Sequence, residues 1–390
     1  MVFIDNMNRK IYIDYAATSY IRQEVLNEMM PYLTEHFGNP SSAHSMSREV
    51  KKAIYEAKIR TAKALGANRD EVFFTSGGSE SDNWAIKGVA FRNKDKGNHI
   101  ITSKIEHHAV LNTCKYLEEQ GFKVTYLPVD KDGMVRIDEL EKAINSETIL
   151  VSIMFANNEI GSIQPIKQIG DICKKRGIIF HTDAVQAVGH VPINVKDMNI
   201  DLLSLSGHKF YGPKGIGALY IKKGVKIHNL IHGGSQERAK RSGTENVAGI
   251  VGLGKAIELA IQELDMESKR LVRLRDKLID GLLSIPNSKL NGPTGEERLP
   301  GNVNISFKDV NGEAMLIALD NMGICASSGS ACTAGSIEPS HVLLSLGIPK
   351  DMVKGSIRFS MGLRNNEEDI DYLIKVIPEI VQKIRNLSSK

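Results

Sequence analysis

The sequence predicts an α/β fold, with a large domain built on a mainly parallel sheet and a smaller C-terminal α+β domain. Between about residues 13 and 221, short apolar runs alternate with helical patterns, which is typical of a parallel sheet covered by helices. After about residue 248 this rhythm gives way to long helical stretches and isolated strand patterns. The chain has 390 residues, more than one hydrophobic core usually supports, so we expect two domains.

Seven apolar runs are the expected strands of the large sheet. They cover residues 72–74, 99–102, 124–127, 149–154, 178–181, 202–205 and 216–221. A helix before the first run is indicated by apolar residues at helical spacing from Val50 to Leu65, and Gly66 then supplies a stop. Ligands of open α/β sheets bind outside the carboxyl ends of the strands, so the segments after these runs are the expected location of a site.

The C-terminal part predicts a helix over 248–283, a strand over 302–307, a helix over 312–319 and a strand over 356–359. The last element has apolar residues on one face from Ile370 to Ile384, and Pro378 is expected to kink or split it. We place the domain boundary near residue 255. The large domain is then 15–255, and the small domain combines 1–14 with 256–390.

Composition excludes several classes of protein. Hydrophobic residues make up 42% and charged residues 25%, which is enough apolar material for a sizeable core. The net charge of +4 is too small to indicate nucleic-acid binding. No run approaches the roughly 18 apolar residues of a membrane span, and residues 1–10 lack the apolar centre of a secretory signal. We therefore expect a cytoplasmic protein that binds neither membranes nor nucleic acid.

Lys209 and Asp183 are the most informative pair of residues. Each follows an apolar run that reads as a strand, in Ser206-Gly207-His208-Lys209 and in His181-Thr182-Asp183. A lysine at a strand end can bind an aldehyde cofactor covalently, and a carboxylate at a neighbouring strand end can keep a pyridine nitrogen protonated. This pair is what pyridoxal 5'-phosphate (PLP) chemistry requires.

The four cysteines form no C-x-x-C pair and indicate neither a disulfide framework nor a zinc site. Cys114 and Cys173 lie in helix-like segments and are expected to be small buried residues, and Cys325 lies at a strand-like position and is expected to be structural. Cys332 differs, because its neighbours in Ser327-Ser328-Gly329-Ser330-Ala331-Cys332-Thr333 are small and mostly polar. A cysteine on such a loop, beside a PLP lysine, indicates an enzyme that takes sulfur from an amino acid.

A turn after the first expected strand is a candidate phosphate site. In Thr75-Ser76-Gly77-Gly78-Ser79, glycines and hydroxyls at the start of a helix expose backbone N–H groups to an anion. An ordinary capped turn explains the same residues. The turn matches neither the P-loop nor the G-x-G-x-x-G fingerprint, which disfavours nucleotide cofactors.

Four further segments hold candidates with an alternative explanation each. Glu106-His107-His108 has three interpretations. We favour a His107 that stacks on a flat cofactor and moves protons over a metal site formed by the three residues. The third interpretation is a structural histidine. Asn158 is a donor to cofactor or substrate, or part of an Asn-Gly turn. Arg241 to Thr244 and Arg358 are candidates for binding anions, although surface arginines are common. We expect no metal site.

These residues together resemble a known family. The chain is similar to the cysteine desulfurases of the class V aminotransferase-like enzymes, which have PLP fold type I, the aspartate aminotransferase-like fold. Within them it resembles group I, the NifS/IscS-like branch, because of the Ser-Ser-Gly-Ser-Ala-Cys-Thr loop around Cys332. The resemblance extends from Tyr15-Ala16-Ala17-Thr18 and Gly38-Asn39-Pro40-Ser41-Ser42 to Ser356-Ile357-Arg358-Phe359-Ser360, and therefore covers nearly the whole chain.

The resemblance assigns a role to each candidate. It implies that Lys209 carries PLP, Asp183 binds the pyridinium nitrogen, Gln186 contacts the ring hydroxyl oxygen, His107 stacks on the ring, and Cys332 receives sulfur. The phosphate ligands it implies are Gly78, Ser79, Ser206 and His208, with Thr244 reaching the phosphate of the neighbouring subunit of a homodimer. Asn158 also contacts the cofactor, and with Arg358 it grips the substrate carboxylate.

The implied reaction converts L-cysteine to L-alanine and leaves a persulfide on Cys332. Sulfur-acceptor proteins of iron–sulfur cluster assembly or tRNA thiolation are the implied partners. Alternatives on the same fold are a selenocysteine lyase or another PLP-dependent aminotransferase or lyase, in which Cys332 is incidental. An alternative from another class is a noncatalytic sulfur-relay scaffold, which the intact set of Lys209, Asp183 and Cys332 disfavours.

Overall fold

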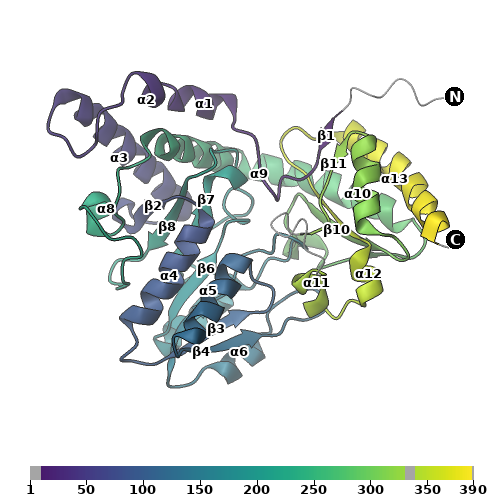
Figure 1. Cartoon of the computed structure of the whole chain (residues 1–390), viewed down its shortest axis with the longest axis horizontal. Coiled ribbons are helices and arrows are strands. Elements are labelled where there is room, and N and C mark those ends of the chain that lie inside the picture. Colours follow the sequence, from purple (N-terminus) through teal and green to yellow (C-terminus); the bar gives the residue numbers. More distant parts are fainter. Residues whose placement is uncertain (1–9, 330–338, 389–390) are drawn as a thin grey trace.

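The larger unit of the protein is a seven-stranded sheet. The structure, a computed structural model, describes residues 10–329 and 339–388. The strands lie in the order β2-β8-β7-β6-β5-β3-β4 (Figure 1). Their bounds are β2 Val72–Thr75, β3 His99–Ser103, β4 Lys123–Leu127, β5 Thr148–Ser152, β6 Ile179–Asp183, β7 Leu202–Ser206 and β8 Gly217–Ile221.

Most neighbours in this sheet are parallel, as the sequence predicts. Only β8 runs antiparallel, to both β2 and β7. Each of the seven apolar runs coincides with a strand to within two residues. The largest differences are of two residues: β5 ends at Ser152 rather than at Met154, and β6 ends at Asp183 rather than at His181.

Helices cover both faces of the sheet, and the alternation of side chains along the strands decides which face each residue meets. Ile100 packs among residues of α4 (Gly78–Arg92) and α5 (His108–Glu119), whereas its neighbour Ile101 packs on the opposite face. That opposite face is covered by α3, α6, α7 and the first part of α9, with bounds Ser45–Leu65, Ile137–Ala143, Ile166–Arg176 and Val247–Leu283. Gly66, with a φ of 68°, ends α3 as predicted.

The smaller unit combines the C-terminal part of the chain with its beginning. Its three-stranded sheet has the order β12-β10-β9, all antiparallel. A second pair joins β1 to β11 in parallel, which brings the beginning of the chain to the C-terminal elements (Figure 1). The bounds are β1 Ile11–Tyr12, β9 Ser288–Leu290, β10 Asn302–Phe307, β11 Ile324–Cys325, β12 Ser356–Ser360, α10 Gly312–Asn321, α11 His341–Ser345, α12 Lys350–Lys354 and α13 Glu367–Ser388.

The long helix α9 belongs to both hydrophobic cores. Its residues Leu253 and Ile257 pack in the core of the large sheet, and Leu274 and Leu278 pack in the core of the smaller unit. In Figure 1 the helix runs from one unit to the other. The boundary predicted near residue 255 therefore lies inside a continuous helix.

Helix α13 is continuous across Pro378, so of the two predicted effects, a kink or a split, the split does not occur. Pro378 removes one backbone N–H donor, yet the apolar face on both sides of it stays in the core, with Ile370 and Ile377 fully buried and Ile384 nearly so. Burial of this face outweighs the lost hydrogen bond. Within the described ranges, no helix combines the length and the apolar character needed to cross a bilayer.

Short helices complete the chain. They are α1 Gln23–Met29 and α2 Pro31–Thr34 before α3, and α8 Gln236–Ala239 between the large sheet and α9. A 3-10 turn over Gly207–Lys209 follows β7 directly. This turn carries Lys209 to the end of the sheet at which the carboxyl ends of the parallel strands lie.

Candidate active site

One cavity gathers almost all of the residues that the sequence singles out. It has a volume of about 190 Å³ and lies at the carboxyl ends of β6 and β7, beside the start of α4. The candidates that line it are Gly78, Ser79, His107, Asn158, Asp183, Gln186, Ser206, His208, Lys209 and Arg358. Thr244 lines a different cavity, and Cys332 lies outside the described residues.

The amine of Lys209 is held at the wall of this cavity by the beginning of the chain. Its Nζ donates to the carbonyl oxygens of Ala16 at 2.5 Å and Ala17 at 2.8 Å. The side-chain amide of Gln186 donates to the same Ala16 oxygen at 2.9 Å. Ala16 and Ala17 therefore position the side chains of two candidate residues, Lys209 and Gln186. In the sequence, residues 16 and 17 stand out only as part of the family motif.

Asp183 is the last residue of β6, and its carboxyl group is nearly buried. One oxygen, Oδ1, accepts the backbone N–H of Val185 at 2.9 Å. Burial raises the pKa of Asp183, and the nearby His107 and Lys209 partly offset this rise. A buried carboxylate of this kind is stabilised by a cation placed against it, and a protonated ring nitrogen is such a cation.

A second buried acid, Asp82 on α4, lies next to Asp183 and was not expected from the sequence. Its pKa is raised well above the usual range, first by burial and then by the negative charge of Asp183. Its Oδ1 is 3.6 Å from Nε2 of His181, and burial lowers the pKa of that histidine to about 3. We assign the proton of this pair to Asp82 and the charge to Asp183, because Asp183 has the Val185 N–H and Lys209 nearby.

His107 caps the start of α5, with its Nδ1 accepting the N–H of Ala109 at 3.1 Å. The proton of the neutral ring is therefore on Nε2. Glu106 is fully buried, with Oε1 accepting from Ser103 Oγ at 2.6 Å and from Met154 N–H at 2.9 Å, and burial raises its pKa to about 8. In the described part of the chain, no three histidine, cysteine or acidic side chains are grouped to hold a metal ion.

The start of α4 has the shape of an anion site. Gly77 has a φ of 157°, and a Cβ on Gly78 would lie only 2.7 Å from Cγ2 of Val185, so glycine is needed for the close approach. The helix begins here with its N–H groups facing the cavity that Ser206 and His208 also line. His208 hydrogen-bonds to Thr18 at 3.1 Å, and burial lowers its pKa to about 4.

Arg358 is brought to the opposite side of the cavity by β12. It is 1% exposed, with Nη2 donating to Asp14 Oδ1 at 2.7 Å and Nη1 to the Asn158 carbonyl at 3.1 Å. Its buried Nε has no hydrogen-bond partner among the described residues. The sequence did not indicate Asp14, because this counter-ion is 344 positions away along the chain.

The segment from Arg241 to Thr244 is separate from this cavity. Thr244 lines a second space of about 190 Å³ beside Ser76, on the turn that leads to Gly78. Arg241 forms an ion pair with Glu80, at 2.8 Å from Nε to Oε1. Its guanidinium is therefore already paired with a carboxylate rather than presented to an anion.

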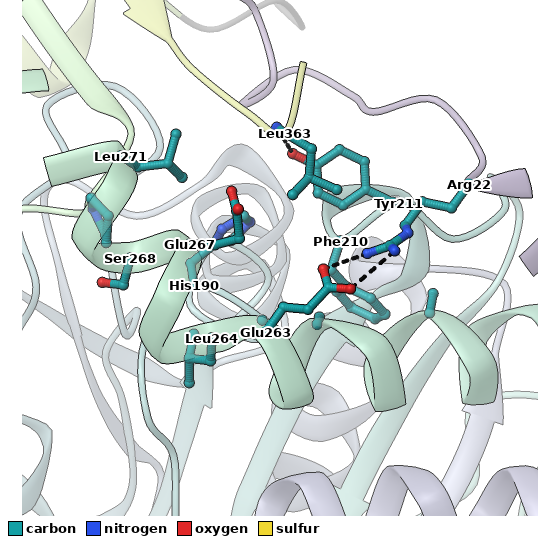
Figure 2. Close-up of a pocket in the computed structure, with 14 residues that line it drawn as sticks. Arg22, His190, Phe210, Tyr211, Glu263, Leu264, Glu267, Ser268, Leu271 and Leu363 are labelled. Atoms are coloured by element: carbon teal, nitrogen blue, oxygen red, sulfur yellow. Dashed lines mark hydrogen bonds and ion pairs between the residues drawn. The ribbon is translucent and has the colours of Figure 1, made fainter. Parts of the chain in front are cut away.

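A further residue, His190, contacts the backbone of Lys209, and the sequence analysis did not identify it. It faces a small cavity of about 30 Å³ bounded by the Arg22–Glu263 ion pair, Tyr211 and α9 (Figure 2). Its Nε2 is 3.1 Å from the backbone carbonyl of Lys209. No sequence motif distinguishes this histidine from a structural one.

The comparison with protein families agrees with this geometry. The family described as aminotransferase class-V matches residues 11–373. The chain belongs to this family. A cysteine desulfurase IscS from Clostridium botulinum is 61% identical over 384 residues, covering 98% of this chain and 97% of that protein.

Solved structures of the family match as well. A NifS-like protein has a TM-score of 0.91 and 42% identity, covering 96% of this chain and 100% of that chain. The structure of SspA in complex with cysteine has a TM-score of 0.80 and 40% identity, covering 90% of this chain and 98% of that chain. These class-V relatives confirm the resemblance to NifS/IscS-like cysteine desulfurases and the fold that it implies.

PLP is the cofactor of this family, and the described residues fit it. The cavity has an amine at Lys209, a buried carboxyl at Asp183, and a helix start at Gly78 whose close packing tolerates no side chain. These are the groups needed for an aldehyde, a pyridine nitrogen and a phosphate, respectively. Arg358 also lines the cavity, and a guanidinium is a group that can bind an anion.

Proposed function

We propose that the chain is a PLP-dependent cysteine desulfurase that converts L-cysteine to L-alanine and transfers the sulfur to Cys332. The observation that supports this most is the convergence of Lys209, Asp183 and Arg358 on one cavity, in a chain 61% identical to a relative named cysteine desulfurase. In the transfer, the substrate carbon–sulfur bond breaks and a sulfur–sulfur bond to Cys332 forms. Cys332 then carries a persulfide, and the carbon skeleton leaves as alanine.

In this proposal, the residues of the cavity have separate roles in substrate binding and in proton transfer. Bound PLP supplies an electron sink that makes the substrate Cα–H bond acidic. Arg358 and Asn158 hold the substrate carboxylate and so orient that bond. Lys209 binds the cofactor and removes the Cα proton through Nζ, because this amine already lies at the cavity wall.

His107 has a role in activating the sulfur chemistry. Since Nδ1 accepts the Ala109 N–H, the neutral ring offers a donor at Nε2 rather than an acceptor. We infer that His107 stabilises the Cys332 thiolate by donating a hydrogen bond, besides stacking on the cofactor. The remaining ligands are Gly78, Ser79, Ser206 and His208 for the phosphate, Gln186 for the ring hydroxyl oxygen, and Asp183 for the ring nitrogen.

Replacing Cys332 tests the proposal. Cys332→Ser should keep the cofactor and substrate binding but lose alanine production almost completely, because a hydroxyl near its normal pKa cannot accept sulfur. Cys325→Ser is the matched control, since burial raises the pKa of the Cys325 thiol and keeps it protonated. A fully active Cys332→Ser enzyme would replace the desulfurase mechanism with that of a general PLP lyase, with selenocysteine lyase as one case.

The biological setting of the proposal is a cytoplasmic homodimer that passes sulfur to acceptor proteins of iron–sulfur cluster assembly or tRNA thiolation. The position of Thr244 supports the homodimer, because it lies in a separate cavity next to Ser76 and not in the cofactor cavity of its own chain. Mixed dimers test this. When one chain carries Lys209→Ala and the other carries Thr244→Ala, both changes should fall on the same cofactor site, and the second site should remain fully active. If Thr244 instead serves its own chain, no site stays intact: one site lacks Lys209 and is inactive, and the other lacks Thr244 and binds the phosphate more weakly.

A further inference from the structure

One short turn near the beginning of the chain contacts both units of the protein. Residues 14–17 form this turn, which the backbone N–H of Ala17 closes by donating to the Asp14 carbonyl at 3.0 Å. The carbonyls of Ala16 and Ala17 line the cofactor cavity and accept from the amine of Lys209, which belongs to the large unit. At the other end of the turn, Asp14 contacts the smaller unit. The turn therefore links the two units next to the cavity.

The contact with the smaller unit is made on β12. Asp14 Oδ1 accepts from Nη2 of Arg358 at 2.7 Å, and the side chain of Asp14 is 17% exposed. Two residues further along β12, Ser360 Oγ accepts the backbone N–H of Ala16 at 2.9 Å. Residues two apart in a strand share a face, so both side chains meet the turn from the same face of β12. The Tyr15 N–H also donates to the Ser360 carbonyl, at 3.1 Å, which fixes the backbone of the turn against the strand.

The guanidinium of Arg358 is oriented by two anchors. Besides the bond to Asp14, its Nη1 donates to the backbone carbonyl of Asn158 at 3.1 Å. Arg358 is 1% exposed, so little water is available to replace a lost partner. Within the described ranges, Asp14 supplies the only carboxylate that forms an ion pair with Arg358. Removing this carboxylate should leave the guanidinium with one anchor and a freer orientation.

We propose that Asp14 is a positioning residue for substrate binding: through its hydrogen bond from Nη2, it holds the Arg358 guanidinium in the orientation that binds the carboxylate of an amino acid. The same turn holds the amine of Lys209, so Asp14 also fixes the carboxylate-binding group relative to the amine that removes the Cα proton. The inference rests on the proposed function, in which Arg358 binds the substrate carboxylate. Asp14 does not line the cavity, so we expect its effect to reach the substrate through Arg358.

The test measures binding of L-alanine, the product of the proposed reaction, to the cofactor-loaded enzyme through the change in cofactor absorbance. L-Alaninamide, in which a neutral amide replaces the carboxylate, is the matched ligand. Asp14→Ala should weaken L-alanine binding by about 5- to 20-fold, because a misoriented guanidinium loses much of a charge-assisted hydrogen bond. Binding of L-alaninamide should stay nearly unchanged.

Two further variants separate the position of the carboxylate from its charge. Asp14→Asn removes the charge but keeps an oxygen that can accept from Arg358 Nη2, so it should recover most of the affinity for L-alanine. Asp14→Glu keeps the charge but lengthens the side chain by one methylene, so it should weaken L-alanine binding by about threefold or more. This second variant keeps the inference testable if Asp14→Ala does not fold.

Asp276→Ala is the matched control for stability. Asp276 accepts from Nε of Arg275 at 2.8 Å, and Arg275 is as deeply buried as Arg358 but lines no part of the cofactor cavity. This variant also removes a carboxylate from a buried arginine of the smaller unit. It should lose stability, as Asp14→Ala does, and keep the wild-type affinity for L-alanine.

Four results would overturn the inference. They are wild-type affinity for L-alanine in folded Asp14→Ala or in Asp14→Glu, an equal loss for L-alaninamide, an equal loss in Asp276→Ala, and no recovery in Asp14→Asn. Arg358→Ala in the same assay separates this failure from that of the proposed function. If Arg358→Ala keeps wild-type affinity for L-alanine, the assigned role of Arg358 fails, and that of Asp14 fails with it.

If Arg358→Ala binds L-alanine weakly while the Asp14 variants bind it normally, only the positioning role fails. Because binding of L-alanine involves no sulfur transfer, this result does not depend on the outcome of the Cys332→Ser test.

Discussion

His190 donates a hydrogen bond from Nε2 to the backbone carbonyl of Lys209, at 3.1 Å. Burial lowers the pKa of His190, with a smaller contribution in the same direction from the Lys209 charge. The ring is therefore neutral near pH 7, and its single proton lies on the nitrogen that faces the carbonyl. Lys209 is therefore positioned by two sets of hydrogen bonds: its amine bonds to Ala16 and Ala17, and its backbone carbonyl bonds to His190.

The first prediction concerns this second contact. His190→Ala should lower kcat by about 2- to 10-fold, the usual range for one buried hydrogen bond, and leave the KM for cysteine nearly unchanged. His190→Gln, whose amide can donate to the same carbonyl, should restore much of kcat. Steady-state kinetics at saturating cofactor check this, and a loss confined to KM would contradict it.

The second prediction concerns covalent attachment of the cofactor. Reduction of the holoenzyme with borohydride should fix the mass of the cofactor to the peptide that contains Lys209. Lys209→Ala should prevent this labelling, because no other lysine lines the described part of the cavity. Peptide mass spectrometry gives the answer, and label on Lys214 or any other lysine would show the assignment to be wrong.

The third prediction concerns the substrate carboxylate. Arg358→Ala should raise the KM for cysteine by about 10- to 150-fold, equivalent to about 1.5–3 kcal/mol of charge-assisted hydrogen bonding, with little change in cofactor affinity. Arg275→Ala is the control, since Arg275 is an equally buried arginine that bonds to the Arg298 carbonyl on the smaller unit. Stability should fall in both variants, but KM should rise only in Arg358→Ala.

The fourth prediction concerns pH. Burial raises the pKa of Glu106 to about 8 from its ordinary value of 4.5, so the folded protein binds a proton there that the unfolded chain releases. The contribution of Glu106 to the free energy of unfolding is thus complete below pH 4.5 and is lost as the pH rises to about 8. The largest slope is about 1.4 kcal/mol per pH unit.

Denaturation of the holoenzyme between pH 6.5 and 8 isolates this group. Burial lowers the pKa values of His181 and His208 to about 3 and about 4, so these residues destabilise the fold only as the pH falls below the ordinary histidine value of 6.5. The stability of the wild type relative to Glu106→Gln should therefore decline across the measured window. The same comparison with Glu119→Gln, on the exposed face of α5, should give a constant difference.

The sequence predicted the strands and the residues at their ends because both are local signals. An apolar run followed by Asp183 or Lys209 is visible within a few positions of the chain, and parallel strand ends meet at one edge of a sheet. Asp82 and Asp14 were not assigned roles, because their significance lies in partners that only folding brings close. Asp82 appears as one acid on a helix until β6 places Asp183 beside it.

Tertiary packing also explains why Pro378 does not split α13. A proline usually ends a helix, but local propensity does not include the burial of the α13 face on both sides of Pro378. The boundary predicted near residue 255 lies inside α9, whose two parts pack in different cores. The ends of this helix therefore do not mark the border between the two cores.

The pairing of β1 with β11 has a consequence for synthesis of the protein on the ribosome. Tyr12 pairs with Cys325, and Asp14 pairs with Arg358, so the beginning of the chain meets these partners only after residues 325 and 358 have been made. The large sheet itself contains no residue after Ile221. The carbonyls of Ala16 and Ala17 that hold Lys209 follow directly after this paired segment. The amine of Lys209 therefore acquires its final surroundings after the strands of the large sheet, once Arg358 has been made and can hold Asp14.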